Sequence, residues 1–210
     1  MSDLLTLVQW LSPAFPTGSF AYSHGLEAAI AAGEVTDGPG LRRWLSDVLE
    51  FGAGRQDAVL LIHALRPDAD HAALDALTRA LQPSSERLRE TVEQGTAFAR
   101  TVAGITGRDL PPRALPVAVG QAAAVLDLPA EQVAALYLHA FASNLTSVAM
   151  RFVPLGQAVG QGVLAALHPT IAALAADAVT LTLDDLGSCA LGADMSAMTH
   201  ETMDVRIYRT

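Results

Sequence analysis

The stretch from Pro129 to Phe152 reads PAEQVAALYLHAFASNLTSVAMRF and repeats apolar side chains at intervals of three and four residues. Such intervals place side chains on one face of an α-helix. Proline suits the first turn of a helix and stops one that reaches it, and Pro129 and Pro154 stand at these two places. The stretch therefore predicts one long helix with a buried face. The residues on that face are Val133, Leu136, Tyr137, Ala140, Phe141, Leu145, Val148 and Phe152.

The same spacing recurs along most of the chain, between breaks at proline and glycine. Only residues 179–183 alternate as a strand would, and that run is too short to build a sheet. We therefore expect an all-α fold, a single-domain helical bundle of about ten helices over residues 1–210. Periodicity fades after Asp184, so residues 184–210 are predicted to form a partly flexible tail that a partner orders and that contributes little to folding.

Composition excludes several classes of function. The 210 residues carry a formal net charge of −9 with a sequence pI of about 5.0, which disfavours nucleic acid as a partner because phosphate binding needs clustered cations. All 13 cationic residues are arginine. Without lysine the chain has neither a phosphate-binding P-loop nor Schiff-base chemistry of its own. If GTP hydrolysis belongs to the biology, another protein has to supply the nucleotide site.

The mean hydropathy of +0.32 is high for a protein that we expect to be cytoplasmic. The longest stretch without a charge, residues 152–176, is broken by Pro154 and Pro169, so it does not predict a membrane span. An Ala-rich core together with an exposed apolar surface that awaits a partner explains the hydropathy better. Cys189 is the single cysteine, and Asp3 stands where a secretory signal would be basic.

No set of residues predicts catalysis, a cofactor or a resident metal. The six histidines are scattered without ligand spacing, and Cys189, His200 and Glu201 only weakly suggest a transient metal site. Polar residues in the long helix leave one alternative open, a helical enzyme with a buried polar site around His139, Asn144 and Arg151. The charges on residues 86–93 are predicted to form a solvated, balanced helix surface; they are Glu86, Arg87, Arg89, Glu90 and Glu93.

The segment Ser12–Glu27 reads SPAFPTGSFAYSHGLE and differs from the rest of the chain. Pro13 and Pro16 exclude a regular helix, Gly18 and Gly25 permit turns, and the aromatic residues anchor the segment to a core. Composition alone fits a tight connection between helices as well as it fits a functional loop.

Four segments, in chain order, resemble the UreF family of urease accessory proteins. The first is Ser12–Glu27, which is similar to the N-terminal signature of the family, and the second is the charged segment Ser85–Gly95. The third is the long motif from Tyr137 to Gln161, and the last is the ending with His200-Glu201 and Arg206–Thr210. Together these segments span nearly the whole chain.

The resemblance implies a non-enzymatic scaffold for nickel insertion during urease maturation. Such a chain is a homodimer, binds the accessory protein UreD (UreH in some species), recruits the GTPase UreG and helps to pass nickel to apo-urease. The resemblance assigns partner contacts to the signature and to the chain ending. The implied partner-binding residues are Phe20, Tyr22, Ser23, His24, Glu27, His200, Glu201, Arg206, Ile207 and Tyr208.

Overall fold

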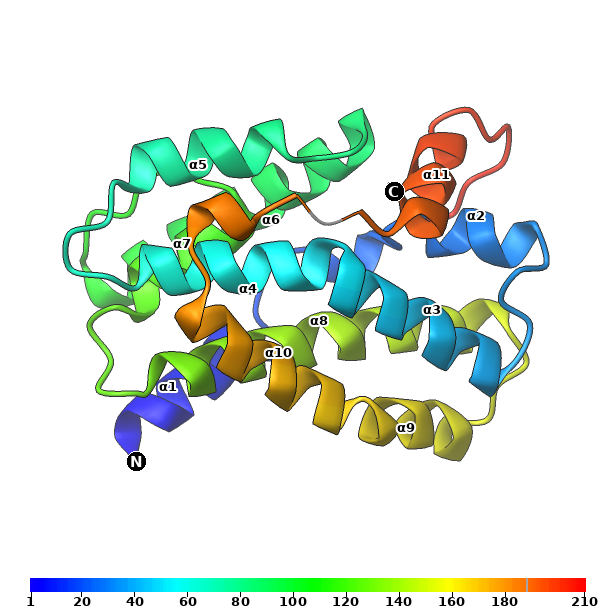
Figure 1. The fold of residues 1–210 in the computed structure, drawn as a ribbon, viewed down its shortest axis with the longest axis horizontal. Coiled ribbons are helices and arrows are strands. Elements are labelled where there is room, and N and C mark those ends of the chain that lie inside the picture. Colours follow the sequence, from blue (N-terminus) through cyan, green and yellow to red (C-terminus); the bar gives the residue numbers. More distant parts are fainter. Residues whose placement is uncertain (188) are drawn as a thin grey trace.

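The computed structural model describes residues 1–187 and 189–210. Within these two ranges the secondary structure consists of eleven α-helices and two short 3-10 helices, with no strand, which confirms the predicted all-α fold (Figure 1). The elements are α1 (Ser2–Trp10), η1 (Ser19–Ala21), α2 (Leu26–Ala31), α3 (Gly38–Phe51), α4 (Ala53–Ala64), α5 (His71–Ala80), α6 (Ser85–Thr106), α7 (Leu115–Ala123), α8 (Ala130–Phe152), α9 (Gln157–Ala166), α10 (His168–Thr180), η2 (Leu183–Asp185) and α11 (Leu191–His200).

Helix α4 is the centre of the bundle. Every residue from Asp57 to Ala64 is buried, because α3, α5, α7, α8 and α10 all pack against this helix. One main hydrophobic core joins α3, α4, α7, α8 and α10 and includes the aromatic side chains of Trp10, Phe98 and Tyr137, whereas α5 packs on α4 and α7 through a second, smaller cluster around Leu74. Figure 1 shows α2 and α11 together at one end of the molecule, with α1 and α7 towards the other end.

Helix α8 begins and ends where the two prolines predict. Pro129 is its N-cap, and the helix stops at Phe152, two residues before Pro154. Of the eight expected inward residues, Val133, Tyr137, Leu145 and Val148 are buried. The other four are partly buried; they are Leu136, Ala140, Phe141 and Phe152. By length and composition alone, α8 and the stretch Gln157–Thr180 are apolar enough to cross a membrane, which is weak evidence because core helices pass the same test. Half of the most apolar window of α8 is buried inside the protein, as in a core helix.

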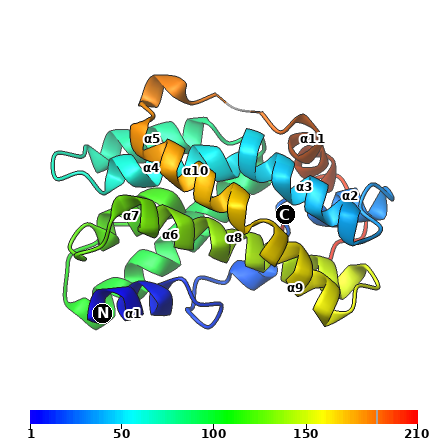
Figure 2. The same ribbon diagram turned by 60° about the horizontal axis from the view of Figure 1, so that its bottom comes forward.

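The end of the chain differs from the expected loose tail. Residues 191–200 form α11, which lies beside α2 (Figure 2) and also packs on α6. Beyond α11 the chain turns back, and Tyr208 and Thr210 are only 6% and 0% exposed. Apolar periodicity could not predict this, since polar contacts hold much of the segment.

Candidate functional site

Three segments that are far apart in the sequence meet at the end of the molecule where α2 and α11 lie. They are the end of the signature, the first turns of α6 and the last eleven residues. Their polar side chains form a buried cluster that we call the polar junction. Each member is at most 6% exposed, and the members are Ser23, His24, Glu27, Glu86, Arg87, Glu90, His200 and Thr210. Three of the four segments that resemble the family therefore contribute to one cluster.

Glu27 is the main anchor of the chain ending. Its carboxylate accepts hydrogen bonds from the backbone N–H groups of Ile207 and Tyr208, each at 2.9 Å. The His200 ring lies between two carboxylates, with Nε2 at 3.1 Å from Glu27 and Nδ1 at 2.7 Å from Glu86. Both ring nitrogens of His200 are thus engaged, so the residue holds α11 in place and has no free nitrogen for a metal.

The first turn of α6 is fixed by residues of the chain ending. Glu201 accepts hydrogen bonds from the Ser85 hydroxyl at 2.7 Å and from the Glu86 backbone N–H at 3.0 Å, and these two bonds lower its pKa. A carboxylate at this position caps the helix and complements its dipole. Arg206 Nη1 donates to Glu86 Oε1 at 2.6 Å, although the Arg206 side chain is 39% exposed. Arg206 therefore joins the buried junction to the surface.

Glu90 carries the second set of contacts. Burial is the largest single effect and would raise its pKa, but the contacts with Arg87 and His24 together outweigh burial and lower the pKa to about 2. Glu90 also accepts a hydrogen bond from the Thr210 hydroxyl at 2.8 Å. The main-chain oxygen of Thr210 in turn accepts from the Ser23 hydroxyl and from the Ser23 N–H, the latter at 2.9 Å. The signature, α6 and the chain ending are linked through these groups.

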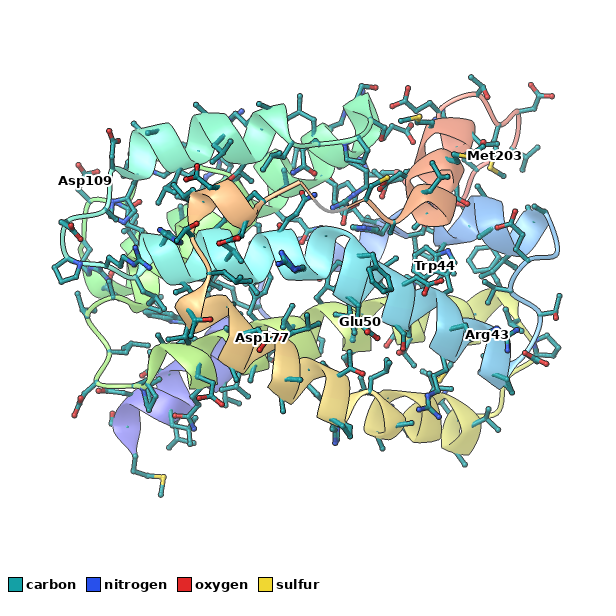
Figure 3. The ribbon with its side chains drawn as sticks, viewed as in Figure 1. Arg43, Trp44, Glu50, Asp109, Asp177 and Met203 are labelled. Atoms are coloured by element: carbon teal, nitrogen blue, oxygen red, sulfur yellow. The ribbon has the colours of Figure 1, made fainter. Side chains whose placement is uncertain are left out.

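His24 occupies a strained position next to Glu90. Its φ of +60° is unusual for a residue other than glycine. Burial lowers the pKa of its ring, whose Nδ1 is 3.9 Å from Glu90 Oε1. The ring packs edge-on against Phe141 of α8 and Trp44 of α3, with centroids 5.1 and 6.5 Å away; Figure 3 labels Trp44 on α3 near α2. His24 thus ties the signature to two core helices.

Tyr22 has a second role at the edge of the junction. Its hydroxyl bonds to the Glu93 carboxylate and accepts a hydrogen bond from Arg209 Nη1 at 3.1 Å. The Arg209 guanidinium also lies over the Tyr22 ring, 5.5 Å from its centroid. Burial and the Glu93 carboxylate raise the Tyr22 pKa. The neutral phenol therefore connects the signature, α6 and the chain ending.

The prediction of a solvated charged surface on α6 is wrong for three of its five residues. Glu86, Arg87 and Glu90 are each at most 6% exposed, whereas Arg89 is exposed and the Glu93 side chain is 40% exposed. Charge alone did not show this, because Glu86 and Glu90 have partners more than 100 residues away in His200 and Thr210. The missed signal was helical spacing, since stepping back from Val102 by threes and fours through Ala99, Gly95 and Thr91 reaches Arg87.

Side chains that a partner could reach surround the junction. Phe20 is 65% exposed and Ile207 is 74% exposed, although the Ile207 backbone is fixed to Glu27. Three more exposed side chains lie on α11; they are Leu191, Met195 and Met198. They share one face of the helix because they are spaced by four and three residues. We call these residues, with Val205 and Ile207 of the segment that follows, the C-terminal apolar set. Its members are Leu191, Met195, Met198, Val205 and Ile207, between 49% and 78% exposed.

The residues of the alternative enzyme site do not converge. Asn144 and Arg151 line a cavity of about 280 Å³ between the signature, α6 and α8, but His139 is not among its lining residues. Asn144 Nδ2 donates to the Ser19 carbonyl at 3.1 Å, and Arg151 Nη1 donates to the Tyr208 hydroxyl at 3.4 Å. These two side chains support the signature and the chain ending.

Sequence reasoning missed a buried polar pair between α4 and α8. The Tyr137 hydroxyl donates to Asp57 Oδ2 at 2.6 Å. Burial raises the pKa of Asp57 to about 6 and also raises that of Tyr137. A single acidic residue at the start of an otherwise apolar run, AVLLIHA, was the available signal.

This chain is similar to known proteins over nearly its whole length. A model of the UreF family matches residues 35–168. A protein from Cereibacter sphaeroides strain ATCC 17023 is 66% identical over 207 residues, which cover 99% of this chain and 98% of that protein. Proteins from Paracoccus denitrificans and Jannaschia sp. are 56% and 51% identical, over 98% and 99% of this chain and 95% and 94% of their own lengths. All three carry the name urease accessory protein UreF.

Proposed function

This chain belongs to the UreF family of urease accessory proteins, and from this premise we propose that it is the scaffold of a nickel-insertion complex. The family acts as accessory, chaperone-type proteins and not as enzymes. In the proposed complex the chain binds a UreD/UreH-like accessory protein. The complex then recruits a UreG-like GTPase and helps to pass nickel to apo-urease in the cytoplasm.

The observation that carries this proposal is the C-terminal apolar set on an anchored chain ending. Five large apolar side chains are exposed there. Glu27 holds the backbone N–H groups of Ile207 and Tyr208, and the carboxylates of Glu27 and Glu86 hold the His200 ring at the end of α11. A fixed backbone loses little conformational entropy when a partner binds, so more of the contact energy appears as affinity. The proposed first contact of the UreD/UreH-like protein is this set, together with Phe20.

The ten residues implied by the resemblance then have two kinds of role. Phe20, Glu201, Arg206 and Ile207 have surface that a partner can reach. The other six are buried within the chain and hold the exposed ones in position; they are Tyr22, Ser23, His24, Glu27, His200 and Tyr208. In this proposal, the homodimer contact and the binding of the GTPase also use surfaces of the folded chain in which the signature, α6 and the chain ending are joined.

An assembly assay with a charged substitution tests the proposal. Ile207→Asp places a carboxylate in the apolar contact and should weaken binding of the UreD/UreH-like protein at least thirtyfold, about 2 kcal/mol. The matched control is Ile105→Asp at the end of α6, where the isoleucine is 57% exposed and outside the C-terminal apolar set. Affinity is measured by calorimetry, complex formation by gel filtration and folding by thermal melting.

The expected result is that both variants melt like the wild type and that only Ile207→Asp loses the partner. Equal binding by both variants would exclude the C-terminal apolar set as the contact. Failure of the wild-type chain to bind a UreD/UreH-like protein from the same organism would reject the proposed function itself.

A further inference from the structure

The fold brings together two histidines that the sequence separates. His139 lies in the middle of α8, and His168 is the first residue of α10, which packs along α8. Their ring centroids are 5.5 Å apart and the ring planes are inclined at 46°. His168 is exposed and His139 is partly exposed, so solvent reaches the pair.

This pair differs from His63, His71 and His200 in how its ring nitrogens are used, and from His24 in that solvent reaches its rings. His63 and His71 each hold a backbone carbonyl, at 3.1 and 2.9 Å, and both nitrogens of His200 face carboxylates. Within residues 1–187 and 189–210, neither His139 nor His168 has a hydrogen bond to another side chain or to the backbone. Their nitrogens are therefore available to a ligand from solution.

The separation of the rings suits a shared metal ion. A first-row metal bonds imidazole nitrogen at about 2.1 Å, so two imidazoles at a tetrahedral angle on one ion have ring centres about 5 Å apart. The observed 5.5 Å is within a side-chain adjustment of this value. Imidazole is a preferred ligand of Ni²⁺, Cu²⁺ and Zn²⁺.

We propose that His139 and His168 form a two-imidazole binding site for a first-row divalent metal ion of the Ni²⁺, Cu²⁺ and Zn²⁺ class. No third His, Cys, Asp or Glu of the described residues completes a ligand group, so water fills the remaining positions. The N-terminus of α10 carries partial positive charge, which weakens the binding of a cation beside it. Both features make the bound ion exchangeable.

The site is separate from the polar junction and does not depend on the proposed function. Figure 1 shows α3 and α4 between α10 and α11, so the histidine pair and the C-terminal apolar set lie on different parts of the molecule. Variants of the pair should consequently leave binding of the UreD/UreH-like protein unchanged.

The test is calorimetric titration of the full chain, without an affinity tag, with NiCl₂ and separately with ZnCl₂. We expect the wild type to bind one ion and His168→Gln to bind it at least tenfold more weakly, about 1.4 kcal/mol. Because two ligands of one ion act as a unit, the double variant with His139→Gln should lose little more than the single variant. His71→Gln is the control, since that ring holds the Ala64 carbonyl.

Proton spectra of the histidine rings during the ZnCl₂ titration give a second readout. The signals of His139 and His168 should shift together at one equivalent, and those of His71 should not. The proposal is overturned if the wild type binds no ion, if His168→Gln binds as tightly as the wild type, or if His71→Gln loses as much affinity. Since His168 is exposed, its variant should melt like the wild type, which keeps the comparison valid even if His139→Gln does not fold.

Discussion

At the scale of single residues, buried charges in this protein differ in how well they are compensated. Glu90 has Arg87 and the Thr210 hydroxyl as partners, and its pKa of about 2 keeps it ionised. Asp57 has only the Tyr137 hydroxyl within hydrogen-bond distance among the residues described, and its pKa rises to about 6. Burial of an acid with one neutral donor favours the protonated form.

Asp57→Asn should therefore stabilise the protein near neutral pH. The native pKa of about 6 exceeds the ordinary 3.8, so between about pH 4 and 6 the native state holds more protons than the unfolded chain. The free energy of unfolding of the wild type then falls, through this group, as pH rises across that window. Asparagine stays neutral and still accepts the Tyr137 hydrogen bond, so the variant should gain up to about 3 kcal/mol over the wild type by pH 7.

Urea unfolding of both proteins from pH 3.5 to 7.5 measures this gain. The difference between variant and wild type should be constant below pH 4 and should grow until pH 6. Glu90 does not disturb this comparison. Its ionised form stabilises both proteins equally, and this contribution is lost only as pH falls from 4.5 toward 2. A difference that is the same at pH 3.5 and pH 7 would show that Asp57 titrates normally.

At the scale of elements, the contact between α2 and α11 depends on one glycine. Gly25 has φ +79°, and a Cβ there would lie 2.6 Å from the Ala197 backbone nitrogen. Gly18 has nearly the same φ, +77°, but a Cβ there would meet nothing within 4 Å. An alanine at either position would have a strained backbone, but only an alanine at Gly25 would also overlap with neighbouring atoms.

Gly18→Ala and Gly25→Ala should consequently differ in stability. Each carries the strain of a left-handed alanine, about 1 kcal/mol. Gly25→Ala also forces α11 away from α2, which we expect to cost about 1–3 kcal/mol more. Denaturant midpoints of both variants give the comparison, and equal midpoints would mean that α11 shifts without cost.

The elements also show what the sequence can and cannot predict. Apolar spacing and the two prolines predicted α8 closely, since its burial follows from its own residues. The same method misplaced the charges of α6 and the order of the chain ending, since both depend on partners far away in the sequence. For the candidate site, the resemblance named segments that the fold brings together, but only the fold shows that six of the ten residues are buried within the chain.

At the scale of the whole molecule, the chain ending and the rest of the polar junction stabilise each other. Without the chain ending, the buried Glu27 carboxylate loses the N–H groups of Ile207 and Tyr208, and Glu90 loses the Thr210 hydroxyl. Hydrogen bonds to charged groups contribute about 1.5–3 kcal/mol each. The chain ending is therefore part of the folded domain, contrary to the expectation of a tail with little weight in folding.

Deletion of residues 202–210 should lower the free energy of unfolding by about 3 kcal/mol or more. Urea unfolding followed by circular dichroism measures the loss, and deletion of residues 1–3 serves as the control at the other end of the chain. If the shortened chain unfolds at the wild-type urea concentration, the contacts of the chain ending do not stabilise the domain. A shortened chain that is less stable could fail to bind the UreD/UreH-like protein because it is partly unfolded. Its stability therefore has to be measured before a loss of binding is assigned to the interface.

The bond between His200 and Glu27 joins residues 173 positions apart, and this distance has a consequence for biosynthesis. A ribosome that adds about 5–20 residues per second needs roughly 9 to 35 s to pass from the first residue to the second. During that interval the Glu27 carboxylate lacks the His200 ring and the backbone N–H groups of Ile207 and Tyr208. The C-terminal apolar set is complete only after translation has passed Ile207, so a chain that stops earlier lacks part of the contact surface that we propose.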